Sequence, residues 1–471
     1  MEGEQIATVV KAEIPTELLT PLGAYVRLRG SGGSFLLESV ERGRLGRYSF
    51  VGRGNRFVSV EEAESLGRPV VGYVAYDHVA RLEPTVPLPE RGPELPESRF
   101  VVADVLLRFD HARGVAELLY GDEEEITRLL GEPATTQSSG PLPASSSLPL
   151  TTREEYEDAV LRAQGHIVAG DIFQVVLSQR AERVTEATAL DLYRALRRIN
   201  PSPYLFLLEL DGLDLIGSSP ETLVKCSEGQ ASLNPIAGTT ERGDGDAERL
   251  LASEKDRAEH VMLVDLGRND LSRVCRPGTV RVTRFLEVER FSHVSHLVSE
   301  VAGELAEEGP FELLRACFPA GTVSGAPKVR AMQLISELEG YRRGPYAGAV
   351  GYSLFDGTLD TCIAIRTIVL ARGVAHLQAG AGIVTDSDPA AEYEECQAKL
   401  AALEAAIDLA EGGLPRLSET PLAREASPRG EDSTNPVRPS LEGDASCRER
   451  RQAARRPAPP AGAADQGGEG L

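Results

Sequence analysis

The chain has 471 residues, 41% hydrophobic and 26% charged, a composition that is typical of a soluble globular protein able to bury a large core. Its formal net charge of −22 argues against a non-specific grip on nucleic-acid phosphates or on acidic membranes. No apolar run approaches the ~20 residues that span a bilayer, and the N-terminus does not resemble a signal peptide. The cysteines form no CxxC pair and no zinc spacing. We therefore expect a reduced, cytoplasmic protein without membrane or nucleic-acid partners.

Two low-complexity stretches predict how the chain is divided. Residues 131–150, GEPATTQSSGPLPASSSLPL, predict a surface linker between an N-terminal region at residues 1–130 and a main region at residues 151–411. Residues 412–471 contain almost no large apolar side chains, so they cannot bury enough surface to offset the entropy of the chain. We therefore expect a disordered C-terminal tail.

The elements predicted in chain order indicate a mixed fold. The N-terminal region holds strand-like runs such as SFLLESV, RYSFVG and VVGYVAYD. The main region opens with a helix, since Thr152 and Glu155 fit a capping box and Gly170 can end it, and the strand DIFQVVLSQR follows. Further helices are predicted at residues 247–266, 327–339 and 389–410. Because strands come in adjacent runs rather than in strict βαβ alternation, we predict an α+β fold with antiparallel sheets.

Carboxylates on two of these helices are candidate ligands for a metal ion. Glu392, Glu395 and Lys399 share one face of the last helix, and Glu259 lies on the helix at residues 247–266. Carboxylates from two helices that meet over a cleft suit Mg²⁺. The alternative is an ordinary solvated helix face with salt bridges, which the spacing alone favours.

Glycine-rich loops and two basic side chains indicate an anion pocket. FPAGTVSGAPKVRAM, residues 318–332, runs into a helix near Pro327, but it lacks the GK[ST] ending of a nucleotide loop and fits a tight turn equally well. QAGAGIVTD, residues 378–386, permits close backbone approach or a bulge. Arg366 stands in the apolar run CIAIRTIVL, which is predicted to be a strand. A guanidinium at this position requires an anionic partner, either an internal carboxylate or a carboxylate of a ligand. His296 lies on an alternating strand, where a lone histidine is more often a core residue than a catalyst.

Taken in order, many segments resemble anthranilate synthase component I, a family of chorismate-utilising enzymes. The resemblance covers most of residues 20–410 and rests on strings that include FLLESVERGRLGRYSFVG, FQVVLSQR, NPSPYLFLLEL, SSPETLVK, PIAGT, AEHVMLVDLGRNDLSRV, HLVSEVAGEL, FPAGTVSGAPKVRAMQLI, YAGAVGY, LDTCIAIRT and QAGAGIVTDSDP. It implies two packed, mostly antiparallel β-sheets flanked by helices. It also implies a Mg²⁺-dependent conversion of chorismate and ammonia to anthranilate and pyruvate.

Matching motifs carry roles onto individual residues. The resemblance implies Glu259 and Glu395 as Mg²⁺ ligands with Glu392 nearby, Glu221 as the general acid for the leaving hydroxyl, and His296 in the elimination of pyruvate. The implied chorismate-binding residues are Gly238, Thr239, Tyr346, Arg366, Gly380, Ala381, Gly382 and Lys399.

Two positions distinguish this sequence from related chorismate enzymes. Enzymes that make aminodeoxychorismate resemble PIKGT, with a lysine that attacks the ring, where this chain has Ala237. Isochorismate and salicylate synthases carry a water-activating lysine where this chain has Gln174, an amide that cannot act as a base at neutral pH. Ammonia is already nucleophilic, so both positions favour its addition. The rivals are an aminodeoxychorismate synthase, disfavoured by Ala237, and a non-catalytic binding regulator, disfavoured by the metal carboxylates together with His296.

Two regulatory and partner features follow from the same resemblance. LLES and NPSPYLF resemble the site for feedback inhibition by L-tryptophan, which implies the residues Glu38, Ser39, Asn200, Pro201, Pro203, Tyr204, Leu205 and Phe206. No cysteine sits in the nucleophile elbow of a glutamine amidotransferase, so we expect either a separate amidotransferase subunit, component II, or the use of free ammonia. Between Phe57 and Val71 the chain is shorter than its relatives, so the details of the family's N-terminal sheet and partner interface do not carry over directly to this sequence.

Overall fold

The computed structural model describes residues 10–16, 19–39, 46–133, 141–143, 145–290, 294–307 and 309–413. The predicted tail therefore lies almost wholly outside the described residues, as do residues 134–140 and 144 of the predicted linker. No helix in the described part of the chain is both long and apolar enough to cross a membrane.

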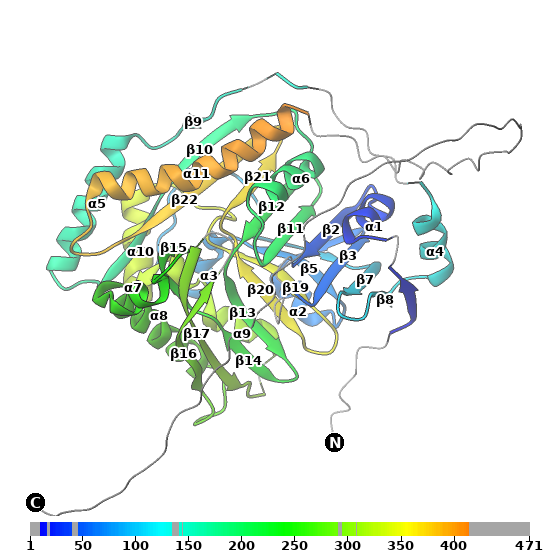
Figure 1. Cartoon of the computed structure of the whole chain (residues 1–471), viewed down its shortest axis with the longest axis horizontal. Coiled ribbons are helices and arrows are strands. Elements are labelled where there is room, and N and C mark those ends of the chain that lie inside the picture. The colour runs from blue at the N-terminus through cyan, green and yellow to red at the C-terminus, as the bar shows by residue number, and fades with distance from the viewer. Residues whose placement is uncertain are drawn as a thin grey trace, which may run out of the picture. The chain divides into compact units, whose positions relative to one another are not determined.

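Two antiparallel sheets form the framework of the described residues (Figure 1), as the resemblance implied. The 12-stranded sheet has the order β1 (Ala12–Pro15), β8 (Val115–Tyr120), β7 (Val105–Asp110), β3 (Tyr48–Gly54), β2 (Gly33–Glu38), β11 (Tyr204–Glu209), β12 (Leu213–Ser219), β21 (Thr367–Ala371), β22 (Val374–Ile383), β10 (Gln174–Val184) and β18 (Gly325–Ala326), with β9 (Leu148–Pro149) paired to β10. The 10-stranded sheet has the order β15 (Ile236–Glu241), β17 (Val294–Glu304), β14 (Gln230–Leu233), β13 (Thr222–Ser227), β20 (Leu359–Ile363), β19 (Ala349–Ser353), β5 (Val70–Val74), β6 (Ser98–Val102) and β4 (Arg56–Val58), with β16 (Arg281–Arg290) paired to β17. Both sheets combine strands from before and after the predicted linker, since β2 pairs with β11 and β5 pairs with β19.

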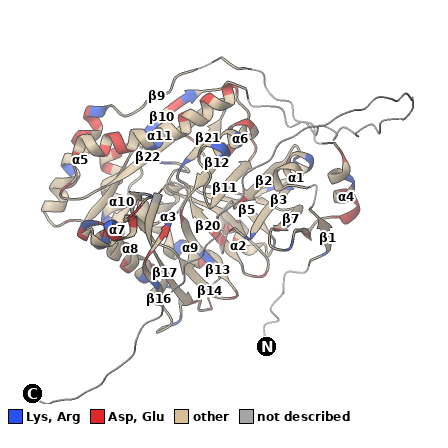
Figure 2. Cartoon of the chain, viewed as in Figure 1, with Lys and Arg blue, Asp and Glu red and all other residues tan. Residues whose placement is uncertain are grey.

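Helices flank these sheets, and α11 lies along β22 beside α5 and α6 (Figure 1). The described helices are α1 (Pro21–Leu28), α2 (Val60–Ser65), α3 (Val79–Leu82), α4 (Glu123–Gly131), α5 (Arg153–Val168), α6 (Ala189–Ile199), α7 (Asp246–Ala252), α8 (Glu254–Ser272), α9 (Pro310–Cys317), α10 (Lys328–Glu339) and α11 (Pro389–Glu411), with 3₁₀ turns η1 (Tyr76–His78) and η2 (Gly321–Val323). Charged residues gather on α5, α7 and α11, while the strands between them carry few (Figure 2). The apolar faces of the helices therefore cover the sheets, which places the core between these layers.

Local signals predicted several helix ends correctly. Thr152 and Glu155 form the expected capping box at α5, with the Glu155 amide donating to Thr152 Oγ1 over 3.2 Å and the Thr152 amide donating to Glu155 Oε2 over 2.8 Å. Helix α11 starts at Pro389 after its cap Asp388. These contacts join residues only three apart, so the sequence is sufficient to predict them.

Two sequence-based expectations were wrong in detail. The helix expected at residues 247–266 is two helices, because Ser253 ends α7 and caps α8 by accepting the Asp256 amide over 3.2 Å. Arg366 does not stand within a strand. It lies between β20 and β21 in the left-handed conformation, with φ of 50°, where the chain leaves the 10-stranded sheet for the 12-stranded sheet.

Candidate active site

Two glycines of β22 hold open the space in which several predicted site residues meet. A Cβ atom at Gly382 would lie 2.6 Å from Gln174 Nε2 and 3.9 Å from Glu259 Oε1. A Cβ atom at Gly380 would lie 2.9 Å from the hydroxyl oxygen of Tyr346. Glycine is therefore required for close approach at both positions, as the sequence suggested. Ala381, between them, is buried in the core, so only its backbone can face a ligand.

Gln174, at the start of β10, contacts a predicted metal ligand. Its Nε2 donates a hydrogen bond to Glu259 Oε1 over 3.1 Å. Its Oε1 is buried and has no hydrogen-bond partner among the described residues. A buried acceptor of this kind is normally satisfied in a working protein, so the amide oxygen is available to a ligand with an N–H or O–H group.

Lys399 and Glu395 lie on α11, which packs along β22. The Lys399 ammonium donates to the Gly380 carbonyl over 2.7 Å and pairs with Glu395 Oε1 over 2.7 Å. Glu392 lies on α11 about one turn before Glu395. Burial raises the pKa of Glu392, a hydrogen bond with Ser387 lowers it, and the charge of Glu395 raises it further. The contact between Glu395 and Lys399 is also the ion pair that the alternative of an ordinary helix face predicts.

Few side chains near the glycine run could serve as ligands for Mg²⁺. The described residues contain no group of three or more histidine, cysteine or acidic side chains that could hold a metal ion. Mg²⁺ commonly takes one or two carboxylates and completes its octahedron with water and substrate oxygens. Glu259 of α8 lies near Gly382, and Glu395 of α11 pairs with the lysine that bonds to Gly380. Two hard oxygen donors of this kind suit such an ion.

Glu221 and Arg366 form a second group next to β13. Burial raises the pKa of Glu221 to about 8, against the opposing effects of the Thr322 hydroxyl and of Arg366. Burial also lowers the pKa of Arg366, while Glu221 raises it. Arg366 and Glu221 are therefore close enough for each to shift the pKa of the other. At neutral pH most of Glu221 is protonated and can donate a proton.

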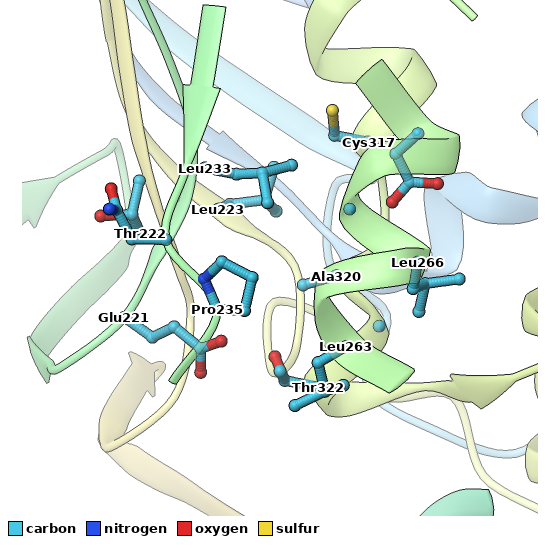
Figure 3. Close-up of a pocket in the computed structure, with 14 residues that line it drawn as sticks. Glu221, Thr222, Leu223, Leu233, Pro235, Leu263, Leu266, Cys317, Ala320 and Thr322 are labelled. Atoms are coloured by element: carbon cyan, nitrogen blue, oxygen red, sulfur yellow. The ribbon is translucent and has the colours of Figure 1, made fainter. Parts of the chain in front are cut away.

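A cavity of about 400 Å³, part of it open to solvent, adjoins Glu221 (Figure 3). The Glu221 carboxyl group points toward Thr322, across the space between the strands and α8 (Figure 3). Thr322 belongs to η2 in the glycine-rich run at residues 318–332, which sequence reasoning treated only as an anion loop or a turn. Nothing in the spacing of that run indicates its contact with a residue about 100 positions away.

His296, on β17, lies beside the same guanidinium. Its Nδ1 is 2.9 Å from the carbonyl oxygen of Gly238, a residue at φ of 67° in a β-bulge of β15. A carbonyl only accepts, so Nδ1 carries the proton and the lone pair of the neutral ring is on Nε2. Burial lowers the pKa of His296, the bond to Gly238 raises it, and Arg366 lowers it, so the ring is neutral at neutral pH. The backbone of Thr239 is opposite His296 in the same pair of strands.

Helix α8 connects the two groups. A Cβ atom at Gly238 would lie 3.1 Å from the Cβ of Asp256, which precedes Glu259 by about one turn. The Ala237 side chain is buried in the same bulge. The predicted residues thus fall in two groups. Gln174, Glu259, Glu395 and Lys399 surround the glycine run of β22, and Glu221, His296 and Arg366 lie near β13, β15 and β17.

A second cavity contains most of the residues predicted for tryptophan, and its space of about 740 Å³ is partly open to solvent. Glu38, Ser39, Pro203, Tyr204, Leu205 and Phe206 line it, whereas Asn200 and Pro201 do not. Asn200 instead ends α6, and its carbonyl accepts a hydrogen bond from the Ser218 hydroxyl. Sequence reasoning missed the remaining lining, of which Leu37, Arg47, Tyr48 and Phe50 are near Glu38 in sequence, whereas Lys225, Val350, Gly351, Tyr352, Asp360 and Cys362 come from distant segments.

The chemistry of this second cavity suits a zwitterionic aromatic molecule. Charges of both signs line it, with Lys225 Nζ 3.0 Å from Asp360 Oδ2, alongside several aromatic rings. The Ser39 hydroxyl oxygen is buried and has no hydrogen-bond partner among the described residues. Ligand sites of this kind combine apolar walls with a few polar groups that fix orientation.

Comparison with known proteins agrees with the resemblance seen in the sequence. The model of the family described as chorismate binding enzyme matches residues 39–405. A protein from Thermus thermophilus named anthranilate synthase component 1 is 44% identical, over 84% of this chain and 97% of its own. Its namesake from Mycolicibacterium smegmatis is 43% identical, over 83% of this chain and 90% of its own. The crystal structure of anthranilate synthase component I from Streptococcus pneumoniae has a TM-score of 0.71 and 34% identity, covering 83% of this chain and 99% of that one.

Proposed function

Because the chain belongs to the family of chorismate binding enzymes, we propose that it converts chorismate and ammonia to anthranilate, pyruvate and water. The relatives named anthranilate synthase component 1 support this reaction. One observation carries the proposal: a carboxyl group that is protonated at neutral pH and a neutral imidazole lie beside one buried guanidinium. An acid, a base and an anion-binding cation are the groups that such a replacement and elimination require.

The residues divide the chemistry into two steps. In the first, ammonia adds at C2 of the ring, the double bond shifts, and the C4 hydroxyl leaves as water with a proton from Glu221. In the second, His296 Nε2 accepts the proton from C2, and the enolpyruvyl group leaves as pyruvate while the ring becomes aromatic. Arg366, between the two groups, pairs with a substrate carboxylate.

Mg²⁺ would be held by Glu259 and Glu395, the carboxylates near Gly382 and Gly380. When bound, it supplies Lewis-acid stabilisation at the ring carboxylate. Gln174 positions Glu259 through its Nε2 and leaves Oε1 to accept an N–H of the incoming nucleophile. The absence of a basic side chain at Gln174 and at Ala237 supports ammonia over water or a protein amine as the nucleophile.

Ammonia is supplied by a glutamine amidotransferase partner, which the designation of the relatives as component 1 supports. L-tryptophan inhibits the enzyme from the second cavity. We name this cavity the aromatic pocket and define it by the lining residues given above. Its paired charges and aromatic walls support an aromatic amino acid as the occupant.

The reaction is tested by mixing the purified chain with chorismate, Mg²⁺ and an ammonium salt at mildly alkaline pH, and following anthranilate fluorescence. The chain contains no tryptophan, so its own emission is weak. We expect a rise in anthranilate that EDTA abolishes and excess Mg²⁺ restores. Loss of chorismate without anthranilate would assign the aminodeoxychorismate or isochorismate reaction instead. Untouched chorismate, even with an amidotransferase partner and glutamine, would leave a binding regulator.

A further inference from the structure

We propose that a hydrogen bond between Tyr204 and Thr222 transmits occupancy of the aromatic pocket to the catalytic acid Glu221. Tyr204 lines the aromatic pocket, whereas Thr222 lines the cavity that adjoins Glu221. Their hydroxyl oxygens are 2.7 Å apart. This inference rests on the proposed function and adds to it the residues through which inhibition would act.

The direction of this hydrogen bond follows from proton counting. The Tyr204 hydroxyl is also 3.2 Å from Asp360 Oδ1, and a carboxylate can only accept. Burial raises the pKa of Tyr204 well above its usual value, with Asp360 adding to the effect, so the phenol keeps its single proton. Tyr204 therefore donates to Asp360 and accepts from Thr222. A ligand that competes for either the phenol or Asp360 changes what the Thr222 hydroxyl can bond to.

The backbone around Thr222 gives the signal a short path to the acid. Thr222 follows Glu221 directly, and it is opposite Cys362 of β20, another residue of the aromatic pocket. The amide of Ile363 donates to the Glu221 carbonyl over 3.0 Å. The register of β13 and β20 shifts between Thr222 and Val224, so the ladder is irregular at the residue that follows Glu221.

A second connection ends at Arg366, whose charge acts on Glu221. The Ser218 hydroxyl donates to the Asn200 carbonyl, at the start of the NPSPY run that supplies Tyr204. The Ser218 amide donates to the Arg366 carbonyl over 3.1 Å. Arg366 is held at φ of 50°, a conformation that non-glycine residues rarely adopt, so its position depends on such contacts. Both ends of the Glu221–Arg366 pair are thus tied to segments that form or border the aromatic pocket.

The test separates tryptophan binding from inhibition. Thr222→Val keeps the shape of the side chain but removes its hydroxyl, whereas Thr222→Ser keeps the hydroxyl. Because the chain has no tryptophan, the indole emission of added L-tryptophan reports binding directly, with no need for activity. Thr361→Val is the matched control, since it removes a buried hydroxyl from the neighbouring strand that donates to the Val224 carbonyl over 2.8 Å and does not contact Tyr204.

We expect Thr222→Val to bind L-tryptophan as the wild type does, while the tryptophan concentration that halves anthranilate formation rises about tenfold or more. Thr222→Ser and Thr361→Val should be inhibited like the wild type. Equal inhibition of Thr222→Val and the wild type would overturn the relay, and so would a parallel loss of binding, because Thr222 would then only support the pocket. A wild-type chain that makes no anthranilate would instead refute the proposed function.

Discussion

Glu221 illustrates how burial alone can change the role of a side chain. In water a glutamate is ionised at neutral pH, with an ordinary pKa of 4.5, whereas burial raises the pKa of Glu221 to about 8. The neighbouring Arg366 opposes this effect without cancelling it, because desolvation is the larger effect on Glu221. The result is a carboxylic acid that stays protonated beside a cation, which a catalyst for the loss of hydroxide can use.

Glu221→Gln is predicted to lower kcat by about 10²- to 10⁴-fold, the usual contribution of a general acid. Wild-type kcat should fall as the pH rises through about 8, where Glu221 ionises, and the residual activity of the variant should lack this limb. Steady-state anthranilate formation between pH 6 and 9 measures both.

Stability provides an independent readout of the same group. Because the folded pKa is raised, the associated stabilisation is fully present below the ordinary pKa and is lost as the pH rises through about 8. The side chain of Glu221→Gln stays neutral at every pH. Between pH 4.5 and about 8 the Tm of this variant should therefore decline less than the Tm of the wild type. Parallel Tm curves would contradict the raised pKa.

At the scale of elements, the pair of strands β10 and β22 builds the site. Val176 is opposite Gly382 and Ser178 is opposite Gly380, so the two glycines fall on one face of β22. They differ in what surrounds them. A Cβ atom at Gly380 would lie 2.8 Å from the backbone oxygen of Leu177, whereas the nearest atom at Gly382 is the flexible amide end of Gln174.

Gly382→Ala is predicted to fold but to lose activity. The new Cβ would push Gln174 from Glu259, and disturbing a group that orients a metal ligand typically costs about 10- to 100-fold in activity or metal affinity. Activity titrated against Mg²⁺, together with Tm, measures the two effects. Gly165→Ala in α5 is the control, since its Cβ would meet nothing within 4 Å, and it should be fully active. A fully active Gly382→Ala would show that Gln174 does not support Glu259.

The sequence predicted those features that depend on neighbours along the chain. The Thr152 capping box and the Pro389 helix start are contacts between residues a few positions apart. The break at Ser253 was not predicted, because the residues on both sides have helical patterns. Arg366 was misplaced because apolar runs flank it, although they belong to different sheets. Contacts such as Tyr204 with Thr222 bring together residues that only the packing of the two sheets makes neighbours.

At the scale of the whole described unit, the aromatic pocket lies between the two sheets. Its lining from β2, β3 and β11 belongs to the 12-stranded sheet, and its lining from β13, β19 and β20 belongs to the 10-stranded sheet. A ligand in this position contacts both sheets at once, including strands from before and after the predicted linker. Binding there should therefore stabilise the folded unit as a whole.

L-Tryptophan is accordingly predicted to raise the Tm of the wild type, since a ligand at 100 times its Kd adds about 2.7 kcal/mol of stability. Ser39→Ala removes a buried hydroxyl that has no partner among the described residues, so it should leave the Tm without ligand nearly unchanged. The same substitution should weaken the binding of tryptophan by about 1 kcal/mol, which is roughly a fivefold increase in Kd, because one hydrogen bond to the ligand is lost.

Differential scanning fluorimetry over a tryptophan series measures both values, and Ser227→Ala, at an exposed strand end outside the pocket, is the control. Ser39→Ala should shift the whole titration to higher tryptophan, whereas Thr222→Val should leave the titration in place and change inhibition alone. The two variants thus separate a residue that holds the ligand from one that transmits its presence. An unchanged Tm at saturating tryptophan in the wild type would mean that the space between the sheets has a different occupant.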